Sequence, residues 1–249
     1  MDSKVVVWAL FDSGNGCYYQ VSKEFEEIEI YSVGLDIENK NSHFINCDLG
    51  RLHLFGENEV YKTLDKLPRP DLIIASPPCE SWSQASAMAN GNACWKREEG
   101  DCFFRPRVPF SNFTIRDYKD YSKYQYDPVK QFSKRINGEL CTFNLVQIIK
   151  KYQPKYYIIE NPATSRIWEY IEKILGFEIP YDNFTRYNNY DNYPTQKPTK
   201  FKGNIELNLK KDKKANKIPF NNLNGYNNRS NIPISLVKEI FRKILEIEI

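Results

Sequence analysis

The sequence predicts an α/β fold in which a mostly parallel sheet carries helices on both of its faces. Short apolar runs that suit buried strands occur at 5–11, 28–37, 42–49, 71–76 and 156–161, and helical patterns alternate with them. Strands that alternate with helices form parallel sheets, because each helix crosses over one face to reach the next strand. Glycines, acids or prolines directly follow several of these strands, and ligands in such sheets bind at the carboxyl ends of the strands.

The helices are predicted from apolar residues that recur at helical spacing. They fall at 18–25, 57–66, 138–152, 168–176 and 234–249. The last of these segments is amphipathic, so we expect it to pack back against the sheet.

Two long segments do not fit this alternation, 84–135 and 182–228. The first is polar, aromatic and irregular, and the second is rich in Asn, Lys and Tyr. Irregular stretches of this length within a compact domain usually carry function or are disordered. We therefore expect a single domain over 1–249, with these two segments as inserts.

The composition is that of a globular protein with a buried core, since 41% of the residues are hydrophobic. No apolar run is long enough to cross a bilayer, and the N-terminal MDSKVVVWALF reads as a first strand rather than a signal peptide. We therefore expect a cytoplasmic protein without a membrane partner. The six cysteines are scattered without a CxxC pair, and neither of the two histidines lies at ligand spacing from them, so no metal site is expected.

The net charge of +3 says little, but the distribution of charge suits a nucleic-acid surface. Between 103 and 135 basic residues alternate with Phe and Tyr, and between 197 and 217 lysines far outnumber acids. Cations bind phosphates and aromatic rings stack on bases. A solvated, lysine-rich loop would give the same pattern, and charge alone does not separate the two interpretations.

The segment DSGNG at 12–16 places Gly14 and Gly16 between a strand and a helix. Glycines there let the backbone approach a ligand closely. Asp36 ends the next predicted strand, where its carboxylate could accept hydrogen bonds from a ribose, and Asp48 could accept one from an adenine amino group. This spacing indicates an adenosine-containing cofactor, but it does not separate NAD from S-adenosylmethionine.

The most specific segment is DLIIASPPCESWS at 71–83, in which a buried strand leads through two prolines to Cys79. The prolines fix the backbone and remove two amide donors, so the thiol is held at a set position. A second predicted strand, YYIIENP at 156–162, also ends in polar residues that can do chemistry, Glu160 and Asn161.

Together these motifs resemble the DNA cytosine-C5 methyltransferase family. The family's Pro-Cys nucleophile motif is similar to the segment around Cys79, its Glu-Asn-Val motif to YYIIENP, and its Phe-x-Gly-x-Gly cofactor loop to ALFDSGNG. The C-terminal RSNIPISLVKEIF at 229–241 resembles the motif that closes the cofactor pocket. The motifs occur in the family's order, and the resemblance covers 1–83, 138–176 and 229–249.

The resemblance implies a Rossmann-like class I S-adenosylmethionine-dependent methyltransferase fold. We also expect a monomer that acts on double-stranded DNA. Cys79 would attack carbon 6 of a flipped cytosine, Glu160 would hydrogen-bond to N3, and Asn161 would hold the loop that bears Cys79. The cofactor S-adenosylmethionine would be bound by Phe11, Gly14, Gly16, Asp36, Asp48, Pro77 and Asn231.

The chain departs from the family where a Gln-x-Arg-x-Arg motif is expected, because the nearest candidate is YPTQKPTKF at 193–201. Arg166 or Arg186 could supply the missing guanidinium, or Lys197 and Lys200 could substitute as point charges. The usual target-recognition region is short, and 84–135 is long, as in compact phage or mobile-element members of the family. The residues expected to contact nucleic acid are Ser83, Arg105, Arg107, Arg116, Arg166, Lys197 and Lys200.

Several alternatives remain at this stage. The same chemistry could act on a tRNA, the chain could be a non-catalytic nucleic-acid-binding relative, or Cys79 could serve a cysteine hydrolase, although that class needs a histidine base. Asp48 could be an ordinary turn residue and Glu160 a partner of a helix N-terminus. Trp82 and Trp168 suit packing better than substrate stacking. A cognate restriction endonuclease is a possible partner that the sequence does not reveal.

Overall fold

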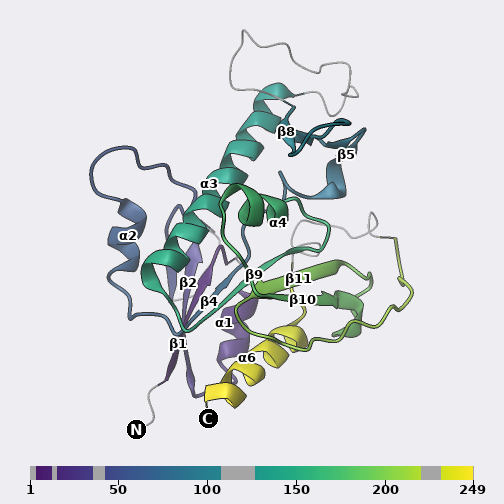
Figure 1. Ribbon diagram of the computed structural model, residues 1–249. Helices are drawn as coiled ribbons and strands as arrows, with labels where there is room; N and C mark the ends of the chain where they lie inside the picture. The colour runs from purple at the N-terminus through teal and green to yellow at the C-terminus, as the bar shows by residue number, and fades with distance from the viewer. Residues whose placement is uncertain (1–3, 13–15, 36–42, 108–126, 220–230, 249) are drawn as a thin grey trace.

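The computed structural model describes residues 4–12, 16–35, 43–107, 127–219 and 231–248 (Figure 1). Three predicted site residues, Gly14, Asp36 and Arg116, lie outside these ranges. Among the residues that the structure describes, the helices are all too short or too polar to cross a bilayer.

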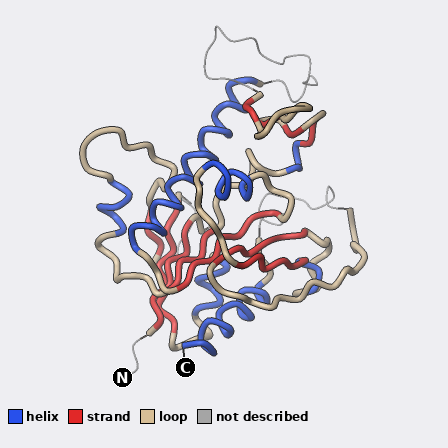
Figure 2. The backbone as a smooth tube through the Cα atoms, in the orientation of Figure 1, coloured by secondary structure: helices blue, strands red, loops and turns tan. Residues whose placement is uncertain are grey.

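A seven-stranded sheet forms the centre of the molecule (Figures 1 and 2). Its strands, in chain order, are β1 (Val5–Leu10), β2 (Ile28–Gly34), β3 (Phe44–Asn46), β4 (Leu72–Ala75), β9 (Tyr156–Pro162), β10 (Tyr181–Arg186) and β11 (Pro198–Gly203). They are arranged in the order β10-β11-β9-β4-β1-β2-β3. The strands from β9 to β3 pair in parallel, and β11 is antiparallel to both of its neighbours. The predicted α/β class with a mostly parallel sheet is therefore confirmed.

The central strands are apolar along their whole length because both faces of the sheet are covered. In β1, Val5, Val7 and Ala9 pack into the core on one face, whereas Trp8 and Leu10 pack into the core on the other. This alternation follows from the geometry of a strand, in which successive side chains point to opposite faces.

The helices divide between the two faces of the sheet (Figure 1). On one face α1 (Cys17–Ser22) contacts α6 (Ile234–Glu248), and the apolar side of α6 is buried there, as the amphipathic pattern predicts. On the other face lie α2 (Glu59–Leu64), α3 (Pro128–Tyr152) and α4 (Ile167–Glu169), the last continuing into the π-helical turn η3 (Tyr170–Ile174).

The prediction that 84–135 is irregular is wrong for the part that the structure describes. A short 3-10 turn, η1 (Gln84–Ser86), leads into a four-stranded antiparallel sheet, and α3 begins ten residues before its predicted start at 138. Asp127 caps α3 by accepting a hydrogen bond from the Lys130 amide at 2.9 Å, and Pro128 suits the first helical turn. The strands of the small sheet are β5 (Ala87–Met88), β6 (Gly91–Asn92), β7 (Trp95–Lys96) and β8 (Arg105–Pro106).

The prediction that 182–228 is an insert is also wrong in part. β10 and β11 belong to the main sheet, and the 3-10 turn η4 (Tyr187–Asn189) follows β10. Their sequences, YDNFTR and PTKFKG, are polar even where they are buried, as at Asn183 and Thr185 in β10 and at Thr199 and Lys202 in β11. This leaves 204–219 as the described loop of that segment.

Candidate active site

The predicted site residues gather at one edge of the sheet, where β1, β4 and β9 end side by side. These strands are neighbours and parallel, so their carboxyl ends lie at the same edge. The chain leaves β1 for β2 on one side, and β4 lies on the other side of β1. The crevice outside such a switch in strand order is where open α/β sheets bind ligands.

The loop that bears Cys79 is held by its own backbone and by the neighbouring strand. The carbonyl oxygen of Cys79 accepts hydrogen bonds from the backbone amides of Trp82 at 3.0 Å and Ser83 at 2.8 Å, which closes a tight turn. The buried side chain of Asn161 donates from Nδ2 to the Pro77 carbonyl oxygen at 3.0 Å. Asn161 therefore makes the kind of contact that its predicted role requires.

Helix α3 supports the same loop from the opposite side, through a close approach at Gly138. A Cβ atom on Gly138 would lie 2.0 Å from Ser81 Oγ and 3.0 Å from Trp82 Nε1, so only glycine permits this contact. A cavity of about 300 Å³ lies between the loop and α3, lined by Pro78, Glu80, Ser81, Lys134, Asn137 and Gly138.

The thiol of Cys79 is partly buried and strongly favours its protonated form. Burial raises the pKa of Cys79 to about 12, and the negative charges of Glu80 and Glu160 act in the same direction. The positive charge of Lys197 opposes them and lowers the pKa. A thiolate here therefore depends on a nearby cation or on a change that accompanies substrate binding.

Glu160 is buried beside Cys79, and burial raises the pKa of its carboxyl. Lys197 and two hydroxyl groups oppose that shift. The Tyr187 hydroxyl donates to Glu160 Oε1 at 3.1 Å, and Ser76 forms the other side-chain hydrogen bond. Ser76 Oγ also lies 2.9 Å from the Tyr18 hydroxyl on α1, so a chain of hydroxyl groups connects α1 with Glu160.

Lys197 lies inside this cluster rather than on an open surface. Its predicted roles, as a point charge in place of the missing guanidinium and as a contact to nucleic acid, stay predictions. Its side chain is partly buried, and its Nζ is 4.5 Å from the centroid of the Tyr187 ring. Burial lowers the pKa of Lys197, and the charges of Glu160, Cys79 and Cys17 raise it, in decreasing order. The sequence shows that Lys197 stands near the expected arginine motif, but only the fold places it beside both Cys79 and Glu160.

The remaining candidates for the missing guanidinium are engaged elsewhere. Lys200 forms an ion pair with Asp182, and Arg186 donates to the Lys211 carbonyl oxygen. Arg166 is partly buried, with its guanidinium 4.7 Å from the Phe104 ring centroid and a hydrogen bond to the Trp82 carbonyl oxygen at 3.4 Å. These contacts stabilise the sheet edge and the loop after Cys79.

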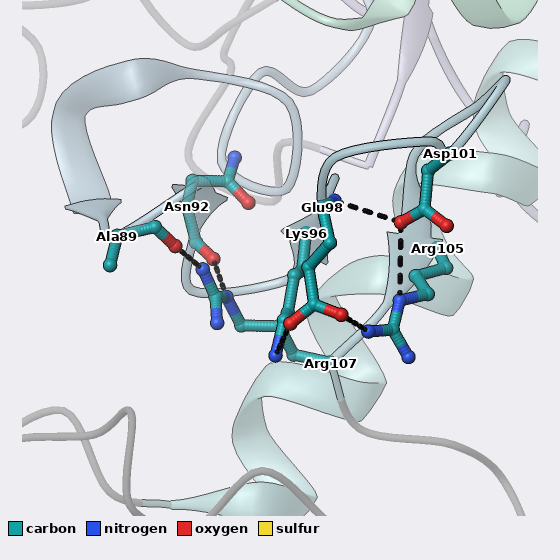
Figure 3. Close-up of polar contacts among 7 residues, drawn as sticks. All are labelled: Ala89, Asn92, Lys96, Glu98, Asp101, Arg105 and Arg107. Atoms are coloured by element: carbon teal, nitrogen blue, oxygen red, sulfur yellow. Dashed lines mark hydrogen bonds and ion pairs between the residues drawn. The ribbon is translucent and has the colours of Figure 1, made fainter.

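The basic residues of the small sheet are also paired within the protein (Figure 3). Arg107 is buried, and its Nε donates to the Asn92 carbonyl oxygen at 2.6 Å while its Nη2 donates to that of Ala89. This contradicts its predicted role in reading DNA, because the guanidinium is used to fold the insert. Arg105 is exposed but forms ion pairs with Glu98 and Asp101.

The Trp82 ring joins this small sheet to the main domain. It stacks on Trp95 with centroids 5.1 Å apart, and it is fully buried, as its predicted packing role requires. Ser83 lies at the same junction, where its carbonyl oxygen accepts a hydrogen bond from Asn92 Nδ2 at 2.9 Å. Because its own amide donates to the Cys79 carbonyl oxygen, Ser83 connects the Cys79 loop with the small sheet.

The predicted cofactor residues that the structure describes lie around the end of β1. Phe11 and Gly16 both have a left-handed backbone, with φ of 57° and 47°, so the chain turns sharply on both sides of the glycine loop. Pro77 is buried at the end of β4, and the backbone amide of Ile232 hydrogen-bonds to the Cys17 thiol, which brings neighbouring Asn231 to α1. These residues therefore come from the ends of β1 and β4 and from the segment before α6, and their binding of a cofactor stays a prediction.

Asp48 does not join this group. Its side chain is exposed, and Oδ1 accepts a hydrogen bond from the Gly50 amide at 2.9 Å. This is the contact of a turn residue, the alternative interpretation that the sequence left open.

A lysine-bearing segment, 208–217, runs along the same edge of the sheet and was not foreseen as an ordered element. Its backbone carbonyls accept hydrogen bonds from side chains of β10, η4 and the loop before β11, including Thr185 to Lys210 at 2.6 Å and Gln196 to Lys214 at 2.8 Å. Asn188 and Asn189 bind further carbonyls of the segment. The exposed lysines on it are Lys210, Lys211, Lys213, Lys214 and Lys217.

No protein-family model and no curated protein matches this chain.

Proposed function

We propose that this chain is an S-adenosylmethionine-dependent DNA methyltransferase that acts on carbon 5 of cytosine. The observation that carries the proposal is the arrangement of Cys79 and Glu160 at the ends of adjacent parallel strands, with Asn161 bonded to the Cys79 loop. A nucleophile and a buried carboxyl group next to each other, with the loop between them fixed, are the parts that this reaction needs.

The reaction requires a nucleophile because carbon 5 of cytosine is itself weakly nucleophilic. When the Cys79 thiolate adds to carbon 6, a carbon–sulfur bond forms and electron density moves to carbon 5 and toward N3. After methylation, loss of the carbon-5 proton and cleavage of the carbon–sulfur bond restore the aromatic ring and release Cys79. A cytosine inside a duplex cannot reach the thiol, so the base has to be flipped out of the helix.

Glu160 suits the role of holding a proton at N3. Burial raises the pKa of this carboxyl group, so its protonated form is available at a higher pH than for an exposed glutamate. A hydrogen bond from the carboxyl group to N3 stabilises the charge that develops on the ring. The hydrogen bond from the Tyr187 hydroxyl to Oε1 fixes the orientation of the carboxyl group.

The cofactor would lie over the ends of β1 and β4. Phe11, Gly16, Pro77 and the segment that begins at Asn231 would hold it, and it would supply the methyl group. The mostly parallel sheet, with one antiparallel strand between β9 and β10, is compatible with the class I methyltransferase fold.

Duplex DNA would lie along the carboxyl edge of the sheet. The exposed lysines of 208–217 are held at this edge, where they can contact phosphates without reading the bases. The insert is joined to the Cys79 loop through Trp82 and Trp95, so it would lie close to the flipped base.

Methyl transfer from labelled S-adenosylmethionine to duplex DNA and to tRNA, followed by bisulfite sequencing of the DNA, tests the proposal. We expect 5-methylcytosine in DNA from the wild type, none from Cys79→Ala, and wild-type activity from the matched variant of an exposed cysteine, Cys102→Ser. Methylation of tRNA alone would move the substrate to RNA, and full activity of Cys79→Ala would overturn the proposal.

A further inference from the structure

Lys197 has a strained backbone, and its side chain lies in the cluster formed by Cys17, Cys79, Glu160 and Tyr187. Its φ is +31°, in the left-handed region, although it carries a long side chain and precedes Pro198. A residue before proline ordinarily prefers an extended backbone, so this conformation has to be imposed by its surroundings. The amide of Gln196 donates to Asn216 Oδ1 at 2.6 Å and its side chain to the Lys214 carbonyl, which anchors the turn just before Lys197.

The groups around Lys197 come from four parts of the chain. Cys17 is at the start of α1, Cys79 is in the loop after β4, Glu160 is at the end of β9, and Tyr187 is in η4. On the Cys79 side the facing charges are Glu80, Glu160 and Lys197, and Lys197 is the positive one among them. The Tyr187 ring, 4.5 Å from Lys197 Nζ, favours an ammonium at this position.

We propose that Lys197 is a positioning residue that supplies the positive charge against which the Cys79 thiolate forms. When the S–H bond breaks, its electron pair stays on sulfur, the proton leaves to water, and the ammonium of Lys197 balances the new negative charge. Burial favours the protonated, neutral form of Glu160. The ammonium of Lys197 then has no carboxylate of Glu160 to balance, so its charge can stabilise the thiolate. The purpose of the thiolate rests on the proposed function. The position of Lys197 rests on its backbone turn, its contact with the Tyr187 ring and the hydrogen bond from Tyr187 to Glu160.

The test measures the titration of the Cys79 thiol in the free protein, without cofactor or DNA. Alkylation by iodoacetamide is followed by peptide mass spectrometry from about pH 6 to about pH 10, where the rate at each pH reports the small fraction of thiolate, the form that reacts. We expect Lys197→Met and Lys197→Gln to slow alkylation of Cys79 about tenfold or more at neutral pH, equivalent to a pKa increase of about one unit. Lys197→Arg should restore most of the rate, because it keeps the charge.

The protein supplies its own controls for this measurement. Lys200→Met removes a lysine three residues away that pairs with Asp182, and it should leave the Cys79 titration unchanged. Exposed Cys102 reports the reagent, and buried Cys94 and Cys141 react only if a variant has unfolded. Should Lys197→Met unfold, Lys197→Gln and Lys197→Arg carry the comparison.

Wild-type alkylation of Cys79 in folded Lys197→Met or Lys197→Gln would overturn the inference, and so would an equal loss in Lys197→Arg. Methyl transfer by the wild type is measured in parallel. Its absence would contradict the proposed function but leave the thiol titration intact, so the two failures are distinguishable.

Discussion

Burial acts in the same direction on the two residues proposed to do the chemistry. It raises the pKa of the Cys79 thiol and of the Glu160 carboxyl group, so both favour their neutral forms in the free protein. A protonated carboxyl group suits the proposed bond to N3, whereas a protonated thiol is a poor nucleophile. Glu160 is therefore already in the form that its proposed role needs, whereas Cys79 requires a nearby cation to form a thiolate.

Replacement of Glu160 by glutamine separates its effect on stability from its effect on catalysis. Because folding raises the pKa of Glu160, the folded protein holds this proton more tightly than the unfolded chain does. The free energy of unfolding therefore falls as the pH rises through the folded-state pKa. Glu160→Gln cannot ionise, so its melting temperature should gain on that of the wild type from about pH 5 to about pH 8. Methyl transfer should fall about 100-fold or more.

The matched control for this prediction is Glu24→Gln. Glu24 forms an exposed ion pair with Lys238, far from the cluster, so the variant should track the wild type across the pH range and keep its activity. Parallel melting curves for Glu160→Gln and the wild type would show that the carboxyl group carries no burial penalty.

At the scale of elements, α3 packs against the Cys79 loop and helps to fix its position. The helix is long and carries Gly138 in its interior, although glycine is a poor helix former. The contact with Ser81 and Trp82 explains this choice, since a side chain at 138 would occupy the space that the loop needs. The absence of a side chain at Gly138 thus allows both the packing of α3 and the position of the loop that bears Cys79.

Gly138→Ala tests this contact with two opposing effects. Alanine should gain up to about 1 kcal/mol of helix propensity, but the clash with the loop should cost about 1–3 kcal/mol. We expect a net loss of stability in chemical denaturation and slower methyl transfer, because the Cys79 loop shifts. Ser133→Ala, at an exposed position of the same helix, should lose neither. A Gly138→Ala variant as stable and as active as the wild type would show that the loop yields freely.

At the scale of the whole molecule, the sheet brings the Cys79 loop, Glu160, the turn after β1 and the lysine-bearing segment to one edge. The ends of β1, β4 and β9 hold Phe11, Cys79 and Glu160, and the end of β10 leads to the side chains that bind the lysine-bearing segment. The carbonyls of that segment accept hydrogen bonds from side chains of the fold, and its Lys211, Lys213 and Lys214 are exposed.

Removal of Lys211, Lys213 and Lys214 should weaken binding to all duplex sequences alike. Each phosphate contact contributes about 0.9 to the slope of log affinity against log salt concentration, so the triple alanine variant should flatten that slope by up to about 2.7. Fluorescence anisotropy across a salt series measures it. The control replaces Lys23, Lys62 and Lys66, which are exposed on other parts of the fold. Equal slopes for the two triple variants would place the DNA elsewhere.

Much of the fold could be predicted from the sequence because the central strands are buried on both faces. Runs such as LIIA in β4 admit few other interpretations. β10 and β11 escaped prediction because they are polar, short of the β-branched pattern and paired at the edge of the sheet. The small sheet escaped because its strands are only two residues long and are stabilised by contacts such as those of Arg107.

The site was predictable where a motif places a residue at a strand end, as for Cys79, Glu160 and Asn161. It was not predictable where a role depends on contacts distant in sequence. Lys197 is separated from Cys79 by more than a hundred residues, and only the pairing of β11 with β9 brings it to Glu160. Arg107 is of a residue type that often binds DNA, but it is buried and bonded to backbone carbonyl groups, which gives it a structural role.

The central claim, that Cys79 forms a covalent bond with a cytosine ring, is tested most directly by trapping that bond. Duplex DNA that contains 5-fluorocytosine is incubated with the wild type and S-adenosylmethionine, and the digested complex is analysed by mass spectrometry. Because fluorine at carbon 5 cannot leave as a proton does, the adduct should accumulate on the peptide that contains Cys79, and it should be absent from Cys79→Ala. An adduct on another cysteine, or none while ordinary cytosine is methylated, would contradict the account.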